Sequence, residues 1–484
     1  MSSSLSFTNP PANLPLKPIP GSYGTPFFGA IKDRHDYFYN QGEEEFFASR
    51  IKKYQSTVIR LNMPPGPFIS QDPRVIAVLD AVSFPVLFDT SKVEKRDCLD
   101  GTFRPSVSFT GGYRTCAFLD PSEPNHNSIK AFVLSILASK HNAFIPLFRN
   151  CLSKLFTDID KKMSSEKKVC YNFMNDAMAF SFVFQLLCEK DPADTRLGNM
   201  GSIYVDKWLA LQLAPLGTIH LPSFLKFLED IAIRTFQFPF FLVKHAYDKL
   251  YKAFYEHAAP LLDRAESFGI KRDEACHNLV FLAGFNAYGG MQGVFPALLK
   301  WVGQAGEHLH AQLAHEIRTA VKEEGGVTFQ ALDNMTLTKS VVYECLRLEP
   351  PVPYQYARAK KDIVVHSHDA AYEIKKGEMI FGYQPCATSD PKVFDNPKQF
   401  VADRFVGEEG EKLLNYVYWS NDRETHLPTV EDKQCPAKDQ VVLLARLFLV
   451  EFFLRYDTYT VEVKTHIGLV SYLTITSLAK ATSS

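Results

Sequence analysis

Three features of the sequence place reactive or polar side chains where chemistry could use them. Cys435 stands in "KQCPAKD", between two lysines and shortly before an apolar stretch. Glu344 and Arg347 are three residues apart in "YECLRLEPP". Asn286 and Ala287 lie in the apolar stretch "FLAGFNAYGGMQGVF", directly before a Gly-Gly step. A thiol, an acid–base pair and an amide in an apolar helix are each candidates for a cofactor-binding or catalytic site.

The segment around Cys435 predicts a loop that leads into a buried helix. The run "DQVVLLARLFLVEFFLRY" that follows is apolar on most sides. A thiolate at a helix N-terminus, flanked here by Lys433 and Lys438, is stabilised and can serve as a metal ligand or nucleophile. Taken alone, the segment favours the simpler interpretation of a buried free thiol.

Glu344 and Arg347 are predicted to share one face of a helix, because residues three apart are neighbours on a helix surface. The helix is expected to end before Pro350 and Pro351, which cannot continue it. By itself the pair favours a surface ion pair worth about 0.2–0.5 kcal/mol. The glycines after Asn286 are also unusual, since glycine in a helix interior costs about 1 kcal/mol relative to alanine.

The elements that position these residues are mostly helical. Helical periodicity runs from about residue 125 to 347, with strand-like segments near residues 56–63 and 362–385. The fold class is therefore predicted to be mainly α with minor β. No flexible linker divides the chain, so we predict an extended Pro-rich segment over residues 1–30 and a single catalytic domain over residues 31–484.

Composition excludes several classes of protein. The chain has 484 residues, 22% of them charged, and a formal net charge of −1, which gives no reason to expect a nucleic-acid partner. Its nine cysteines are scattered, odd in number and without a CxxC, which argues against a disulfide framework and a zinc site. The histidines of "HLHAQLAH" are spaced for a solvated helix face. No signal peptide, transit peptide or membrane anchor is evident.

Taken together, the three features resemble the cytochrome P-450 haem-thiolate fold, over about residues 15–465. They occur in the order typical of that family, with "FVADRF" supplying Arg404 between the helix of Glu344 and the cysteine loop. The resemblance implies that Cys435 is the axial ligand of the iron of haem b. It also implies that Glu344, Arg347 and Arg404 form a buried network beside the haem loop.

Departures from the family pattern indicate which chemistry remains. Oxygen-activating members carry an acid and an alcohol in the distal helix, where this chain has Asn286 and Ala287. An amide cannot relay a proton by ionising, and alanine has no hydroxyl. The resemblance therefore points to a substrate that brings its own O–O bond, a hydroperoxide, and to turnover with neither dioxygen nor a reductase.

Within the family, the sequence resembles the plant fatty-acid hydroperoxide-metabolising branch. The segments that carry this resemblance include "LPLKPIPGSYG", "NMPPGPFIS", "FPVLFDTSKVEKRD", "LDPSEPNH", "GFNAYGG" and "KQCPAKD". In that branch, four positions contact the haem propionates or their surroundings, and here they are Lys95, His126, Lys130 and Lys433. Asn286 matches the residue that contacts the substrate. Without the resemblance, Lys95 would be a solvated loop lysine and His126 a capping or surface residue.

The branch members share homolysis to an alkoxy radical that closes to an epoxyallylic radical, and then diverge to different products. Allene oxide synthases tend to have Phe after "VEKxDx", where this chain has Leu99. The segment "GFNAYGG" also resembles the lyases. We therefore predict a hydroperoxide lyase that cleaves 9- and/or 13-hydroperoxides of linoleic or linolenic acid to aldehydes and oxo-acids. The alternatives are a divinyl ether, allene oxide or epoxyalcohol synthase, and less favoured are a monooxygenase and a non-catalytic haem protein.

An aromatic stretch at residues 233–247, "IRTFQFPFFLVKHAY", could face lipid or simply pack in the core. A fatty-acid substrate is poorly soluble in water, so a lipid-facing entrance is the functional hypothesis. We accordingly expect a cytoplasmic protein, or one that associates peripherally with membranes or lipid bodies.

Overall fold

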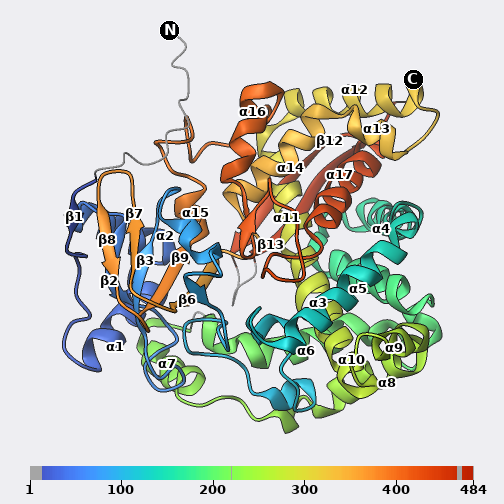
Figure 1. The fold of residues 1–484 in the computed structure, drawn as a ribbon. Coiled ribbons are helices and arrows are strands. Elements are labelled where there is room, and N and C mark those ends of the chain that lie inside the picture. The colour runs from blue at the N-terminus through green and yellow to red at the C-terminus, as the bar shows by residue number, and fades with distance from the viewer. Residues whose placement is uncertain (1–13, 220, 466–470, 483–484) are drawn as a thin grey trace.

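Helices form most of the protein; the strands between residues 16 and 94 and between residues 354 and 383 gather at one side of it, whereas the C-terminal strands lie among the helices (Figure 1). The computed structural model describes residues 14–219, 221–465 and 471–482. This architecture confirms the predicted fold class, mainly α with minor β. Residues 1–13 of the predicted Pro-rich segment lie outside the described residues, and the division of the chain at residue 30 stays a prediction.

The first helical segment of the protein is interrupted. It consists of α1 (Phe28–His35), a π-helical turn η1 (Asp36–Asn40) and α2 (Glu43–Tyr54). Gly42 separates η1 from α2 with a φ of 79°, a conformation that glycine adopts without steric cost. The chain therefore changes direction at this glycine before α2 begins.

Two sheets join the N-terminal segment to residues 354–383, far away in the sequence. The larger has five strands in the order β2 (Val58–Asn62), β3 (Arg74–Val78), β9 (Met379–Tyr383), β6 (Tyr354–Ala359) and β4 (Val93–Glu94). The smaller has β1 (Leu16–Lys17), β8 (Ala371–Ile374) and β7 (Ile363–His366), with Leu16 opposite Ala371 in a parallel pair. The strand-like segments near residues 56–63 and 362–385 are confirmed as strands.

The helical body runs from α3 to α14, as the periodicity predicts, and α17 joins it. Its helices are α3 (Pro124–Ser139), α4 (Phe144–Glu166), α5 (Tyr171–Cys188), α6 (Gly201–Leu213), α7 (Lys226–Arg234), α8 (Lys244–His257), α9 (Ala259–Glu266), α10 (Arg272–Phe281), α11 (Gly289–Ala305), α12 (Glu307–Glu323), α13 (Phe329–Asp333), α14 (Thr336–Leu348) and α17 (Lys438–Arg455). Two short helices, α15 (Gln384–Ala387) and α16 (Gly407–Leu413), lie between α14 and α17.

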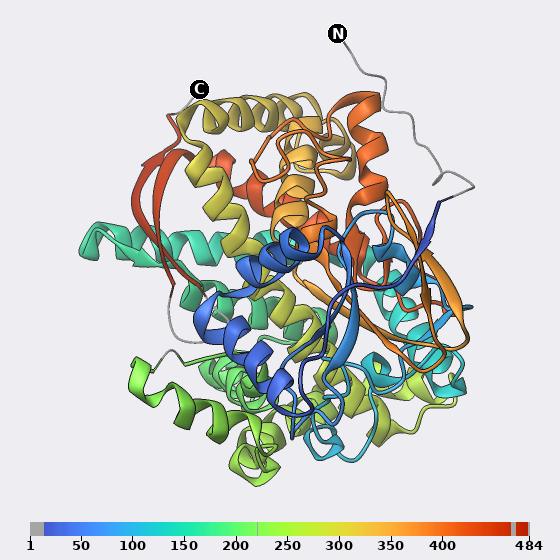
Figure 2. The same ribbon diagram turned by 90° about the vertical axis from the view of Figure 1, so that its left-hand side faces the viewer.

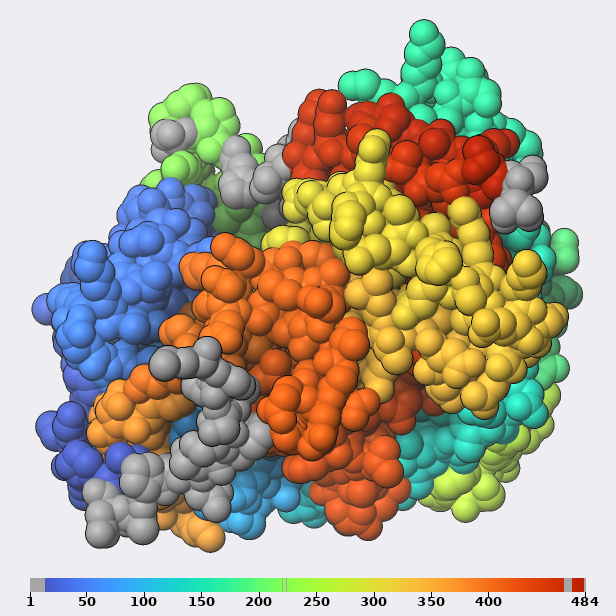
Figure 3. All heavy atoms as spheres, turned by 90° about the horizontal axis from the view of Figure 1, so that it is seen from above, coloured from blue at the N-terminus to red at the C-terminus, as the bar shows by residue number. Residues whose placement is uncertain are grey.

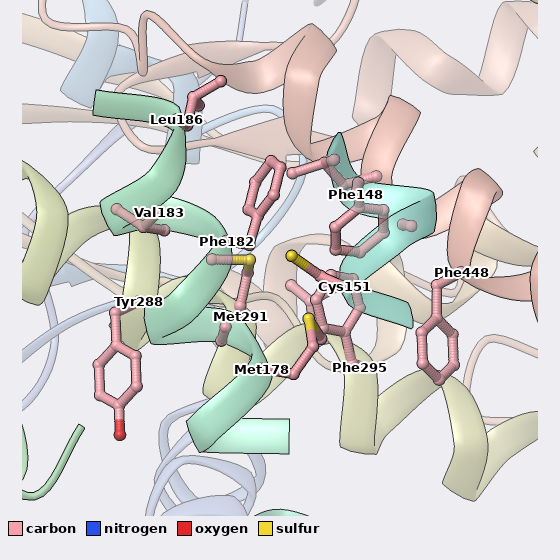
Figure 4. Close-up of a cluster of buried hydrophobic side chains, with 14 of the residues drawn as sticks. Phe148, Cys151, Met178, Phe182, Val183, Leu186, Tyr288, Met291, Phe295 and Phe448 are labelled. Atoms are coloured by element: carbon pink, nitrogen blue, oxygen red, sulfur yellow. The ribbon is translucent and has the colours of Figure 1, made fainter. Parts of the chain in front are cut away.

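The largest apolar core packs α4, α5, α11 and α17 against one another. Phe295 of α11 stacks on Phe448 of α17 with ring centroids 5.1 Å apart, and Phe148 of α4 lies 5.6 Å from Phe295 (Figure 4). All three side chains are almost fully buried. Because aromatic side chains bury large apolar areas, this cluster fixes α11, which follows Asn286, relative to α17, which follows Cys435.

The C-terminal hairpin is not predicted from the sequence. Strands β12 (Tyr456–Thr465) and β13 (Ser471–Lys480) pair antiparallel, and β13 also pairs with β5 (Val169–Cys170). The hairpin and α11 cover His310 of α12, whose ring nitrogens bond Thr458 Oγ1 at 2.8 Å and the Val302 carbonyl at 2.9 Å. His310 is only 1% exposed, so the prediction of a solvated histidine face was wrong there.

Segments distant in sequence meet throughout the protein. The view from the side shows α1 and α2 in front of the later helices (Figure 2), and the view from above shows residues of the blue, orange and yellow parts side by side (Figure 3).

Among the described residues no single helix is long and apolar enough to cross a membrane. One pair, Pro124–Ser139 with His141–Glu166, reaches that length and composition only across a bend of 49°.

Candidate functional site

Glu344, Arg347 and Arg404 form one buried ion network. Arg347 Nε and Nη2 donate to the two oxygens of Glu344, each at 2.8 Å, and Arg404 Nε donates to the same oxygens at 3.1 and 3.0 Å. Glu344 and Arg347 have no exposed surface, so the surface ion pair that the spacing alone favours is excluded. Removing one partner of such a buried network costs about 3–5 kcal/mol, since it leaves an uncompensated charge.

The network joins α14 to the chain that leads toward Cys435. Arg347 Nη1 donates to the carbonyl oxygens of Thr388 at 3.0 Å and Pro397 at 2.7 Å. One turn earlier on α14, the Tyr343 hydroxyl donates to Glu424 Oε1 at 2.7 Å. Lys438, at the start of α17, donates to the Glu424 carbonyl at 3.0 Å. The helix of Glu344 therefore holds both ends of the segment that precedes the cysteine.

Cys435 lies in the turn just before α17, where its sulfur can be held as a thiolate. Its N–H donates to the Ser420 carbonyl at 3.1 Å. Burial raises the pKa of the Cys435 thiol, while the N–H of Ala437 and the charge of Lys130 act in the opposite direction. A backbone donor and a nearby cation favour the charged form of a thiol, which is the form that binds metal.

Two lysines anchor this loop to the rest of the protein. Lys433 Nζ donates to the carbonyls of Cys116, Ala117 and Leu119 at 2.9–3.0 Å. Lys130 of α3 forms an ion pair with Asp432 and donates to its carbonyl at 2.6 Å. The loop is thereby fastened both to α3 and to residues 116–119.

Lys95 and His126 are buried beside these lysines. Lys95 is 6% exposed and His126 is 1% exposed, so neither is the surface residue that its local sequence favours. The pKa of Lys95 is lowered to about 7 and that of His126 to about 4, mainly by burial and in part by the charge of Lys433. No hydrogen-bond or ion-pair partner for the Lys95 ammonium is found among the described residues. Four groups that can carry positive charge thus lie together next to a thiol.

This donor set fits haem. Buried cations need a compensating anion, and the two propionates of a haem would supply carboxylates to them. Thr115, adjacent to the segment that Lys433 holds, has a buried hydroxyl without a partner among the described residues. The thiol of Cys435 matches the sulfur ligand of a haem-thiolate protein.

Asn286 lies in a π-helical turn between α10 and α11. The turn, η11 (Leu282–Tyr288), interrupts what would otherwise be one long helix from residue 272 to 305. The Asn286 side chain is exposed, although Ala283, Gly284 and Tyr288 around it are buried. Its amide has no hydrogen-bond partner among the described residues. π-Helical turns are rare and occur frequently at functional sites.

Leu99 lies on a loop that is linked to the start of this turn. The loop is held by the Asp97 N–H, which donates to the Phe118 carbonyl at 3.0 Å. Phe118 in turn packs edge-on against Phe281, with ring centroids 5.7 Å apart. Leu99 itself is partly buried against the main core. The structure therefore connects the loop of Leu99, the helix of Asn286 and the cysteine loop.

Comparison with known proteins gives close relatives over nearly the whole chain. The sequence profile of the cytochrome P450 family matches residues 307–420. The chain is 54% identical to allene oxide synthase 3 of Solanum lycopersicum, over 97% of this chain and 96% of that protein. It is 52% identical to the 9-divinyl ether synthase of Capsicum annuum, over 97% of this chain and 98% of the relative. It is also 54% identical to allene oxide synthase 2 of Oryza sativa subsp. japonica, over 93% and 94%.

A partly buried thiol before a core helix, with a buried acid–arginine network behind it, is the arrangement expected of a haem-thiolate protein. The chain belongs to the cytochrome P450 family, in the fatty-acid hydroperoxide-metabolising branch that contains the allene oxide and divinyl ether synthases. This confirms the predicted resemblance and the predicted haem cofactor. The roles of the individual site residues stay predictions.

Replacing Cys435 with alanine should abolish haem binding, because the iron then loses its sulfur ligand. The expected result is purified protein with less than about a tenth of the wild-type haem absorbance. Cys386→Ala is the matched control, since Cys386 is also a free, partly buried cysteine. A Cys435→Ala protein that retains full haem absorbance would remove this residue from the iron site.

Proposed function

We propose that the protein converts fatty-acid hydroperoxides without dioxygen or a reductase, with Cys435 as the axial ligand of the haem iron. The observation that carries the proposal is the distal helix, which presents an exposed amide, Asn286, followed by Ala287. Neither side chain can deliver a proton by ionising or through a hydroxyl. A thiolate-ligated haem supplies cleavage of an O–O bond, which a hydroperoxide substrate already contains.

Asn286 would hold the hydroperoxide group. An amide offers two N–H donors and one carbonyl acceptor, so it can both donate to and accept from an O–O–H group. The amide is available for this because no described residue bonds it. Holding the reacting group in place lowers the barrier through orientation, which is a different contribution from proton transfer.

Lys95, His126, Lys130 and Lys433 would contact the carboxylates of the haem or line their surroundings. The pKa of Lys95, about 7 in the protein alone, is lowered by burial. An opposite charge within about 4–6 Å favours the charged form, so a carboxylate beside Lys95 would keep it protonated. Binding of the cofactor would therefore also stabilise the charged form of these buried groups.

Fewer observations bear on which product the protein forms than on which substrate it uses. Leu99, in place of the phenylalanine typical of allene oxide synthases, supports the lyase, which we propose as the activity. The relatives favour the alternative, because their names are those of allene oxide and divinyl ether synthases. All of these reactions would use the same Cys435 and Asn286, so the choice depends on side chains such as Leu99 around the substrate carbon chain.

We also propose that the protein docks on lipid through α7 and its flanking loops. Helix α7 buries charged side chains and exposes apolar ones. Glu229, Asp230 and Arg234 are buried, whereas Phe227 and Leu228 are 62% and 59% exposed. Residues 219–242 carry eight exposed apolar side chains, here called the apolar patch: Ile219, Phe224, Phe227, Leu228, Ile231, Phe236, Phe241 and Leu242.

Two observations support lipid as the occupant of the apolar patch. Such a concentration of exposed aromatic and aliphatic side chains is typical of a surface that contacts protein or membrane. A buried ion pair between Arg34 of α1 and Asp230, with Arg234 beside it, holds the charged face of α7 inward. An apolar substrate partitions into lipid, so a lipid-facing patch would place the enzyme at its source.

Replacing Asn286 with alanine should leave haem bound and lower the turnover of linoleic acid hydroperoxide by about 100-fold, since the hydroperoxide loses its hydrogen bonds. Substrate loss is followed by the absorbance of the conjugated diene, and haem content by its own absorbance. Asn334→Ala, an exposed asparagine remote from the distal helix, is the matched control. Wild-type turnover by Asn286→Ala would contradict the proposed role.

Replacing Leu99 with phenylalanine should shift the products toward allene oxide, detected as ketols. The 9- and 13-hydroperoxides are incubated separately with wild type and Leu99→Phe, trapped within seconds and analysed by mass spectrometry. Short-chain aldehydes from the wild type support the lyase, whereas ketols or intact divinyl ethers establish a synthase. An unchanged product profile in Leu99→Phe would exclude this position from the choice of product.

Replacing Phe236 and Phe241 with serine should weaken binding to phosphatidylcholine vesicles by about ten-fold or more, because each exposed ring would otherwise be buried in lipid. Both side chains are mostly exposed, so folding should be unaffected. Co-sedimentation measures binding, and Phe173→Ser, an exposed phenylalanine on α5, is the control. Equal binding of all variants would rule out this surface as the docking site.

A further inference from the structure

Helix α6 contacts the π-helical turn η11 at two points. The first is Gly284, where a Cβ atom would lie 3.1 Å from Trp208 Cζ3 and 3.2 Å from Val205 Cγ1. A side chain at this position would push α6 away from the turn. Trp208 is itself fixed, because its indole N–H donates to the Phe109 carbonyl at 2.9 Å.

The second point is a hydrogen-bonded triangle at the end of the turn. The Tyr288 hydroxyl donates to Asp206 Oδ1 of α6 at 2.8 Å. Gln292 Nε2 lies 3.1 Å from the same oxygen and 3.0 Å from the Tyr288 hydroxyl. Tyr288 has no exposed surface, and Figure 4 shows its oxygen directed away from the apolar side chains around it. The Tyr288 hydroxyl therefore links the end of η11 to α6 through Asp206.

A second carboxyl group, Asp176 of α5, faces this triangle. The pKa of Asp176 is raised to about 7, mainly by burial and in part by the charge of Asp206. Burial also raises the pKa of Asp206, which the Tyr288 hydroxyl and Gln292 counteract. Hydrogen bonds from two donors therefore favour the ionised form of Asp206, the form that accepts from Tyr288 most strongly.

Tyr288 and Asn286 are two residues apart, so they lie on nearly opposite faces of the helix. Tyr288 faces α6 and is buried, whereas Asn286 is exposed on the other side. A π-helical turn has an unfavourable backbone geometry, so contacts from outside it determine where it begins and ends. The hydrogen bond on the buried face consequently fixes the direction in which the exposed face points.

We propose that Tyr288 and Asp206 are positioning residues that set how η11 presents Asn286 to the hydroperoxide. The inference rests on the proposed role of Asn286 and deepens it. Neither residue touches the substrate, and both act through the geometry of the turn. Loss of the Tyr288–Asp206 bond allows η11 to return toward an α-helical path, which rotates Asn286 away from the reacting group.

The test is a double-mutant cycle in the full-length, haem-loaded protein. Tyr288→Phe removes one hydroxyl and should lower kcat for linoleic acid hydroperoxide about ten-fold, with haem content unchanged. In the Asn286→Ala background the same substitution should change kcat less than about two-fold, because the residue it positions is absent. An equal fold-change in both backgrounds, or no change in the wild-type background, would overturn the proposal.

Two further variants separate positioning from general stability. Asp206→Asn keeps an oxygen acceptor for Tyr288 and should restore most of the activity that Asp206→Ala loses. Tyr456→Phe is the matched control, since its hydroxyl donates to Asp160 Oδ1 at 3.0 Å in a bond between β12 and α4. A loss in Tyr456→Phe as large as that in Tyr288→Phe, or identical activities of Asp206→Asn and Asp206→Ala, would contradict positioning.

The cycle also separates this inference from the proposed function. Wild-type turnover by Asn286→Ala alone would overturn the role of Asn286 and this inference together. Loss of turnover by Asn286→Ala, combined with additive effects of Tyr288→Phe, would leave the proposed function standing and overturn the positioning role alone.

Discussion

Buried positive charge beside the cysteine loop is the constraint on which the rest of the site depends. Lys95, Lys130 and Lys433 lie within one small region, and Asp432 is the carboxylate that pairs directly with one of them, Lys130. Charges that are removed from water are costly unless an opposite charge accompanies them. Haem, with two carboxylates, would supply the opposite charge. Under the proposed assignment, the cofactor is a structural partner of the loop as well as the source of its chemistry.

Much of the site could be predicted from the sequence, because the necessary signals are local. The Glu344–Arg347 spacing placed both side chains on one helix face, and the apolar run after Cys435 predicted the buried α17. Their burial could not be predicted from spacing, since an exposed and a buried ion pair have the same sequence pattern. Arg404 came from resemblance alone, because nothing in "FVADRF" reveals a partner 60 residues away.

Other features depend on tertiary packing and escaped prediction. The Gly-Gly step indicated a weakened helix, but the π-helical turn lies before it, where α6 presses against Gly284. Asp206 is a single acid in the largely apolar segment "SIYVDKWLALQL", a signal that suggests a buried partner without identifying Tyr288. His310 was expected to be solvated because of the spacing of the histidines in "HLHAQLAH", and its burial comes from tertiary contacts with the C-terminal hairpin and α11.

Lys433 fastens the residues around Cys116 to the loop of the sulfur ligand through three carbonyl groups. Backbone carbonyls are the same whatever side chains these residues carry. Substitution of the side chains at residues 116–119 therefore leaves these hydrogen bonds unchanged. Side chains there, and Leu99 on the neighbouring loop that the Phe118 carbonyl holds, can change without loosening this attachment. Such a division allows one scaffold to give rise to several enzymes that share a first chemical step and differ in their products.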